Sequence, residues 1–208
     1  MTTKRLGGLV LAIALAGTLS ACSSDEDVTH ETEAKVDINA APSNASWDTV
    51  HGLKLPSADQ GPEETQPVRF GYDQSAQGAV LAAMNTQGQL AVADDQTWPE
   101  VSRINLAPGK GRDQWAQQRA LISVKGNLKK EQAPRFEGFK VTDFSDDGAV
   151  VVLAVDYPDI GLAAYPVQLQ YRNDDWRVIL PSQEDDVKPK QLENLDGFTP
   201  FSAKENNQ

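Results

Sequence analysis

The spacing of apolar residues changes near the middle of the chain, from a helical period to a strict alternation. Before the change, Val80, Leu81 and Met84 recur at helical spacing within an alanine-rich run. Ser75 stands directly before this run and is a favoured N-cap residue. The pattern therefore predicts a helix from Ala76 to Ala93.

Two shorter helices are predicted next, over residues 97–106 and 111–124, with a break at Ala107-Pro108-Gly109 between them. The alternating half then predicts four strands joined by short turns rich in Asp, Asn and Gly. The predicted strands cover residues 136–144, 149–157, 163–172 and 176–180. Because short turns join neighbouring strands, the sheet is expected to be an antiparallel meander.

The two ends of this region read differently. Residues 47–73 hold several Pro and Gly residues, which predicts an extended arm on the domain. After Pro181 the chain turns polar, but large apolar residues return from Leu192 to Phe201. The sequence thus predicts a single α+β domain over 47–201, with its core at 74–181 and a docking tail at 182–201. Residues 202–208 are expected to fray.

The N-terminus has the pattern of a bacterial lipoprotein signal. Two basic residues precede an apolar run, and Leu19-Ser20-Ala21-Cys22 ends on the only cysteine of the chain. We expect residues 1–21 to be removed and Cys22 to carry the lipid. The alternative, an uncleaved membrane helix, is disfavoured because the apolar run is short for a span. Residues 22–46 are acidic and lack aromatic side chains, which predicts a disordered tether.

Charge limits the classes of partner. The chain has 19 basic and 30 acidic residues, for a net charge of −11. This balance argues against nucleic-acid binding, because phosphate contacts need a basic face. With one cysteine, the domain has no internal disulfide despite its expected oxidising location. The expected location is the outer face of the cell membrane, held by the lipid anchor.

Candidates for catalytic and metal-binding motifs are weak in this sequence. His30 and His51 have no carboxylate or cysteine at metal-ligand spacing, so we predict no metal site and no cofactor. The Pro108–Asp113 segment lacks the spacing of a phosphate-binding loop. Acidic pairs occur at four places, each at an expected turn or helix end, where Asp is favoured for backbone reasons. These pairs are at residues 94–95, 146–147, 174–175 and 185–186.

The order of helices followed by strands over residues 74–181 resembles the nuclear transport factor 2-like, or cystatin-like, fold. That resemblance implies a cone, with about three N-terminal helices packed on a curved four-stranded antiparallel sheet. It also implies a pocket between helices and sheet, which some relatives use as isomerases. The candidate pocket residues are Asp156, Tyr157, Tyr165 and Tyr171.

Short motifs resemble a second, more specific group. They comprise Trp47, Gly52-Leu53-Lys54-Leu55-Pro56, Gly61-Pro62, Gly71-Tyr72, Gly78–Ala83 and the closing Leu195–Phe201. In this order they resemble membrane-anchored proteins of actinobacterial conjugative elements. Members of that family usually have a transmembrane helix where this chain has Cys22. Similar domains, of the TcpC and VirB type, build the outer scaffold of type IV secretion systems.

Three functions follow as hypotheses. The first is a non-enzymatic surface lipoprotein that acts as a scaffold or binds partners, including other envelope proteins or a second copy of itself. The second is a lipoprotein that captures a small ligand in the cone. The third is an isomerase-like enzyme, for which Asp156 would have to face the pocket, and a shift of one residue in register decides this.

Overall fold

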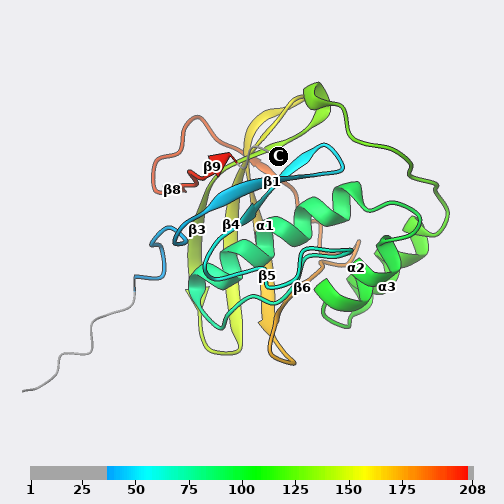
Figure 1. The fold of residues 1–208 in the computed structure, drawn as a ribbon, viewed down its shortest axis with the longest axis horizontal. Coiled ribbons are helices and arrows are strands. Elements are labelled where there is room, and N and C mark those ends of the chain that lie inside the picture. The colour runs from blue at the N-terminus through cyan, green and yellow to red at the C-terminus, as the bar shows by residue number, and fades with distance from the viewer. Residues whose placement is uncertain (1–36, 206–208) are drawn as a thin grey trace, which may run out of the picture. The chain divides into compact units, whose positions relative to one another are not determined.

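The computed structural model of the chain describes residues 37–205, and its first element is a hairpin (Figure 1). Strands β1 (Ser46–Val50) and β2 (Leu53–Ser57) pair in antiparallel fashion. The turn between them uses His51 and Gly52, both at positive φ (47° and 87°), as tight two-residue hairpin turns require. The predicted extended arm thus begins with a hairpin.

Three helices follow: α1 (Ala76–Val92), α2 (Trp98–Asn105) and α3 (Lys110–Arg119). The Ser75 hydroxyl caps α1 by accepting a hydrogen bond of 2.9 Å from the Gly78 amide, as predicted. Helix α3 ends earlier than predicted, and Leu121 beyond it is 85% exposed. None of these helices within residues 37–205 is long and apolar enough to cross a membrane.

The main sheet of the described region has six strands. A 3₁₀ turn (η1, Lys130–Gln132) leads into β3 (Arg135–Phe144), followed by β4 (Gly148–Tyr157), β5 (Gly161–Tyr171) and β6 (Trp176–Ile179). These four strands lie where the alternating pattern predicts them, and each pairs antiparallel with the next. Two further short strands, β7 (Lys190–Gln191) and β8 (Thr199–Pro200), pair with β5 and β3.

The C-terminal segment crosses the sheet between β7 and β8. Because β7 borders β5 and β8 borders β3, the residues between them pass over β4. The residues in register there are all small: Gly138, Ala154 and Ala164. A Cβ atom on Gly138 would lie 2.8 Å from the Thr199 carbonyl oxygen, so β8 lies close against β3 at this glycine. Strand β9 (Lys204–Glu205) then pairs in parallel with β1.

The core lies between α1 and the sheet face opposite this crossing. Helix α1 crosses in front of the main strands, and α2 and α3 lie to one side (Figure 1). Gly88 lets β2 approach α1, because a Cβ there would lie 2.2 Å from a Leu55 methyl group. The largest fully buried side chains include Trp176, Tyr72, Phe139, Leu53, Leu55, Leu81 and Met84.

The predicted fold class is therefore wrong. The helices are not N-terminal in the domain, because the β1–β2 hairpin precedes them, and the main sheet has six strands instead of four. The two extra strands have two residues each and so leave no alternation in the sequence. The cone of three N-terminal helices on a four-stranded sheet does not describe this chain.

Several predictions concern the N-terminal segment. The signal over residues 1–21, lipid attachment at Cys22, His30 and most of the predicted tether lie outside the described residues. Residues 37–46, the last part of that tether, contact the domain. The Asn39 amide group exchanges two hydrogen bonds with the Val141 backbone, at 2.8 and 3.2 Å.

Candidate functional site

A pocket of about 340 Å³ opens beside the β1–β2 hairpin. Its walls come from three parts of the chain: the hairpin, residues 130–137 and Phe201. Three aromatic side chains, Trp47, Phe136 and Phe201, contribute to its lining. We call it the aromatic pocket. Its volume lies within the range usual for small-molecule sites.

The aromatic walls are fixed by packing. The rings of Trp47 and Phe201 lie 5.1 Å apart between centroids, and Phe139 meets Phe201 from the core side at 6.5 Å. The Phe201 amide also donates a hydrogen bond of 2.9 Å to the Glu137 carbonyl oxygen. These contacts hold the segment around Phe201 against β1 and β3. One wall of the aromatic pocket is therefore built from segments that are far apart in the sequence.

The second wall depends on Gly52. The Leu128 amide donates a hydrogen bond of 2.8 Å to the His51 carbonyl oxygen. A Cβ on Gly52 would lie 2.1 Å from the Leu128 carbonyl oxygen. This close approach of two backbones places the start of η1, and with it Lys130, at the pocket.

The ionisable side chains of the pocket are mainly basic. Lys54, Lys130 and Arg135 line it together with one carboxylate, Glu137. Arg135 bonds to Glu137 at 3.1 Å and to Asp156 at 2.5 Å. The hydrogen bond that Arg135 donates to Glu137, together with the charges of Asp156 and Glu137, raises the pKa of Arg135. The lining therefore has three cations against one anion, although the chain as a whole carries a charge of −11.

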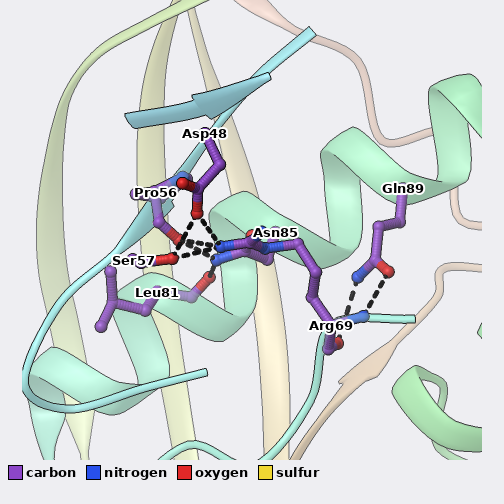
Figure 2. Close-up of polar contacts among 7 residues, drawn as sticks. All are labelled: Asp48, Pro56, Ser57, Arg69, Leu81, Asn85 and Gln89. Carbon is purple, nitrogen blue, oxygen red and sulfur yellow. Dashed lines mark hydrogen bonds and ion pairs between the residues drawn. The ribbon is translucent and has the colours of Figure 1, made fainter. Parts of the chain in front are cut away.

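A buried arginine holds the hairpin of this pocket in place. Arg69 is 2% exposed, and its guanidinium donates to Asp48 at 2.9 Å, to Asn85 at 2.7 Å and to the Pro56 carbonyl oxygen at 3.2 Å. It also contacts the Ser57 hydroxyl. Figure 2 shows the guanidinium between the hairpin and α1. Since an unpaired buried charge is costly, these partners fix the hairpin against α1.

The backbone of Arg69 is held as well. The Gln89 side chain accepts from its amide at 2.8 Å and donates to its carbonyl oxygen at 3.2 Å (Figure 2). The Asn105 side chain donates to the same carbonyl oxygen at 2.7 Å. The segment around Arg69 is thus tied to both α1 and α2.

A second pocket, of about 160 Å³, lies between α1 and the sheet. It shares Pro134 and Phe136 with the aromatic pocket and is lined mostly by apolar side chains. We call it the apolar pocket. Tyr157 and Tyr165, two of the predicted pocket residues, line it. Burial raises the pKa of both phenols, so they stay protonated at neutral pH.

The other two predicted pocket residues lie elsewhere. Asp156 alternates with Val155 and Tyr157 along β4, so it faces the opposite side of the sheet and pairs with Arg135. Tyr171 packs its ring against Trp176, with centroids 5.1 Å apart. The structure therefore brings Tyr157 and Tyr165 together but places Asp156 away from them.

The other candidate motifs have structural roles. His51 forms the hairpin turn, and Gly109 to Asp113 begin α3. The acidic pairs lie in connections between elements, as predicted. Within residues 37–205, no cluster of three or more His, Cys, Asp or Glu side chains could hold a metal ion.

The sequence interpretation missed Arg69 and the basic lining of the aromatic pocket. One signal for Arg69 is present: Asn85 and Gln89 stand four residues apart on α1, and both are buried. A polar stripe of this kind on a buried helix face indicates a buried polar partner.

Comparison with known proteins defines this chain as a member of a domain family. A family model described as a domain of unknown function, DUF8175, matches residues 14–200, so the chain belongs to that family. A search of the curated proteins gave no match, and a search of the solved structures gave none.

Proposed function

We propose that this chain is a lipid-anchored binding protein at the outer face of the cell membrane, and that its binding site is the aromatic pocket. The ligand class is an anion with an apolar or aromatic part. One observation carries this proposal: a strongly acidic chain gathers Lys54, Lys130 and Arg135 around three aromatic side chains.

Physical chemistry favours an anionic ligand there. A lining with a surplus of cations attracts an anion, and the surrounding acidic surface repels the same anion elsewhere. Aromatic walls supply contact area at a low cost in conformational entropy. Arg135 shares its charge with two carboxylates, Glu137 and Asp156, so the two lysines of the lining are the cations to vary in a test.

The anchor is proposed from the sequence around Cys22 and has its own test. Replacing Cys22 with Ser should move the protein from the membrane fraction to the soluble or secreted fraction, because the acyl acceptor is lost. If the Cys22→Ser protein stays in the membrane fraction, the anchor proposal is wrong. The scaffold role in a conjugation or secretion assembly stays a prediction that rests on the motif resemblance.

The pocket proposal is tested with anilinonaphthalenesulfonate, an anionic aromatic dye that fluoresces when bound. The full chain with Cys22→Ser is used, so that no attached acyl chain occupies the pocket. The variant Lys54→Gln/Lys130→Gln should weaken dye binding about 30-fold, since two charge-assisted contacts of about 1 kcal/mol each are lost. A neutral analogue, N-phenylnaphthylamine, should respond little to this variant.

The matched control is Lys140→Gln/Lys188→Gln, which makes the same change of charge at two exposed lysines outside the pocket. It should leave dye affinity within about twofold, because exposed distant charges are screened by salt. Equal weakening by both double variants would show that overall charge, and not the pocket, governs binding. That result would overturn the proposed site.

A further inference from the structure

Leu121 and Ile122 are the most exposed large apolar side chains of residues 37–205, with exposed fractions of 85% and 59%. They follow directly after α3, at the start of the connection to η1. In Figure 1 this connection runs along the outer edge of the view, away from the sheet. Because both side chains are large and aliphatic, they would gain free energy if another apolar surface covered them.

Hydrogen bonds fix the turn that carries this pair. The Leu121 amide donates to the Gln118 carbonyl oxygen at 3.0 Å. Arg119 is 5% exposed, and its guanidinium donates to the carbonyl oxygens of Ile122 and Ala93, each at 2.9 Å. The two apolar side chains therefore stand on an ordered turn, so covering them costs little further chain entropy.

The same connection is basic, although the net charge of the chain is −11. Residues 120–130 contain no Asp or Glu and three exposed lysines: Lys125, Lys129 and Lys130. Asp95 accepts a hydrogen bond from the Val124 amide at 2.9 Å, but its charge is paired with Arg119 at 3.1 Å. Exposed aliphatic side chains beside lysines are the combination that binds the interface of an anionic bilayer.

We propose that the connection after α3 docks on a membrane that contains anionic lipid, with Leu121 and Ile122 inserted and the neighbouring lysines at the phosphate groups. The proposed lipid on Cys22 keeps such a membrane near the domain, because Cys22 stands shortly before residue 37, where the described structure begins. The inference goes beyond the aromatic pocket and rests on the proposed function only for this nearness. Docking would orient the domain on the membrane, which a single attachment point does not.

The test measures sedimentation of the Cys22→Ser protein with vesicles, so that no acyl chain contributes to binding. The vesicles contain equal parts of phosphatidylcholine and phosphatidylglycerol. Leu121→Ser/Ile122→Ser should weaken binding by at least about tenfold, because two aliphatic side chains lose their burial. The matched control, Ile160→Ser/Val187→Ser, changes two other exposed apolar side chains and should bind as the parent protein does.

A second pair of variants tests the charge. Lys125→Gln should weaken binding to the anionic vesicles about fivefold, which is the contribution of one lysine near an anionic surface. Lys140→Gln removes an exposed lysine of β3 and should bind as the parent does. Vesicles of phosphatidylcholine alone should bind the parent at least about tenfold more weakly than the mixed vesicles do.

A single label then reports insertion. No cysteine remains in the Cys22→Ser chain, so Leu121→Cys provides one attachment point for a nitrobenzoxadiazole dye, which brightens in hydrocarbon. Its fluorescence should rise on addition of the mixed vesicles. The same dye on Ile160→Cys should change little, because that residue lies in the β4–β5 turn. Thermal unfolding of each variant checks that it is folded.

The outcomes keep this inference separate from the proposed function. Equal binding of Leu121→Ser/Ile122→Ser and the parent, or an unchanged label on Leu121→Cys, would overturn the docking. A dimer of the parent that this double variant dissociates would assign the surface to a second copy and would also overturn it. Two inserted side chains hold a protein more weakly than one acyl chain, which itself binds reversibly. Washed membranes therefore release the Cys22→Ser protein whether or not it docks, so the anchor test and the dye test stand independently.

Discussion

Arg69 and Asn85 are joined by a hydrogen bond of 2.7 Å between the guanidinium Nε and the amide Oδ1, with both side chains buried. The same Asn85 donates 2.9 Å bonds to the carbonyl oxygens of Pro56 and Leu81. The pair therefore connects the β1–β2 hairpin, the loop before α1 and α1 itself. Since the hairpin carries Trp47 and Lys54, this contact also positions the aromatic pocket.

The first prediction concerns this contact. Arg69→Met keeps the bulk of the side chain but removes the guanidinium that donates to Asp48 and Asn85. We expect the free energy of unfolding to fall by about 2–4 kcal/mol, measured by urea denaturation. Arg103→Met is the control, because Arg103 pairs with Glu100 on the surface and should contribute less than about 1 kcal/mol. Equal effects of the two changes would contradict a structural role of Arg69.

A second prediction follows from Asp95, which joins the start of the α1–α2 connection to the segment after α3. Hydrogen bonds from the Ser123 hydroxyl, the Val124 amide and Arg119 lower the pKa of Asp95 to about 2. A lowered pKa means that the carboxylate stabilises the fold above its unfolded value of 3.8. This contribution is lost as the pH falls from about 4 to 2.

The measurement compares wild type with Asp95→Asn by urea denaturation across that pH range. Wild type should be more stable near pH 5, and its advantage should shrink steadily toward about pH 2. Asp113→Asn removes an exposed carboxylate of α3 and serves as the control for charge alone. A constant difference between wild type and Asp95→Asn at all pH values would show that ionisation of Asp95 is not involved.

Asp175 gives a third prediction with the opposite sign. It is 6% exposed and accepts hydrogen bonds from the amides of Gly71, Tyr72 and Trp176 at 3.1, 3.0 and 2.9 Å. Burial outweighs these bonds and raises its pKa. A raised pKa means that the folded state binds the proton more tightly, so stability from this group falls as the pH rises through the folded pKa.

Asp175→Asn should remove that pH dependence. The stability of wild type relative to Asp175→Asn should increase as the pH is lowered from neutrality toward about 4. Asp174→Asn makes the same change of charge one residue earlier, at an exposed side chain in the same turn. An advantage of wild type over Asp175→Asn that decreases on acidification would contradict the assigned direction.

Elements with a local pattern could be predicted from the sequence, whereas contacts between distant segments could not. The strands β3 to β6 could be predicted because each alternates over at least four residues and ends at a turn. The β1–β2 hairpin was missed because Pro56 and the glycines around it favoured an extended arm. The glycine of His51-Gly52 was the available sequence signal for a hairpin. Tight two-residue hairpin turns require positive φ, which both residues adopt in the structure.

The candidate site could be predicted only in part, because some of its contacts follow from local alternation and others join distant segments. Tyr157 and Tyr165 share a sheet face, which follows from the alternation of side chains and the register of β4 with β5. Asp156 is one residue out of phase and so faces the other way. Lys54, Lys130 and Phe201 come together through the packing of distant segments, which a single sequence does not encode in any local pattern.

A fourth prediction concerns the glycines at the start of α3. A Cβ on Gly111 would lie 2.1 Å from the Leu180 carbonyl oxygen, whereas a Cβ on Gly109 would have no atom within 4 Å. Gly111→Ala should therefore destabilise the protein by about 1–3 kcal/mol, because the backbone beyond β6 has to move. Gly109→Ala should change stability by less than about 1 kcal/mol. Chemical denaturation of both variants measures this, and equal values would show that the close approach is relieved at no cost.

The last prediction concerns Phe201, which anchors the C-terminal segment. Its ring is 7% exposed and packs between Trp47 and Phe139, so Phe201→Ala should cost about 2–4 kcal/mol of stability. The same change removes one wall of the aromatic pocket and should weaken dye binding. Phe198→Ala truncates a half-buried ring three residues earlier, outside the pocket lining, and should leave dye affinity unchanged.

Limited proteolysis of the folded variants should cut at Lys204 sooner in Phe201→Ala than in Phe198→Ala, since β9 depends on Phe201 for its position beside β1. Equal cleavage rates, together with unchanged dye binding in Phe201→Ala, would show that β9 and the pocket are held without this ring.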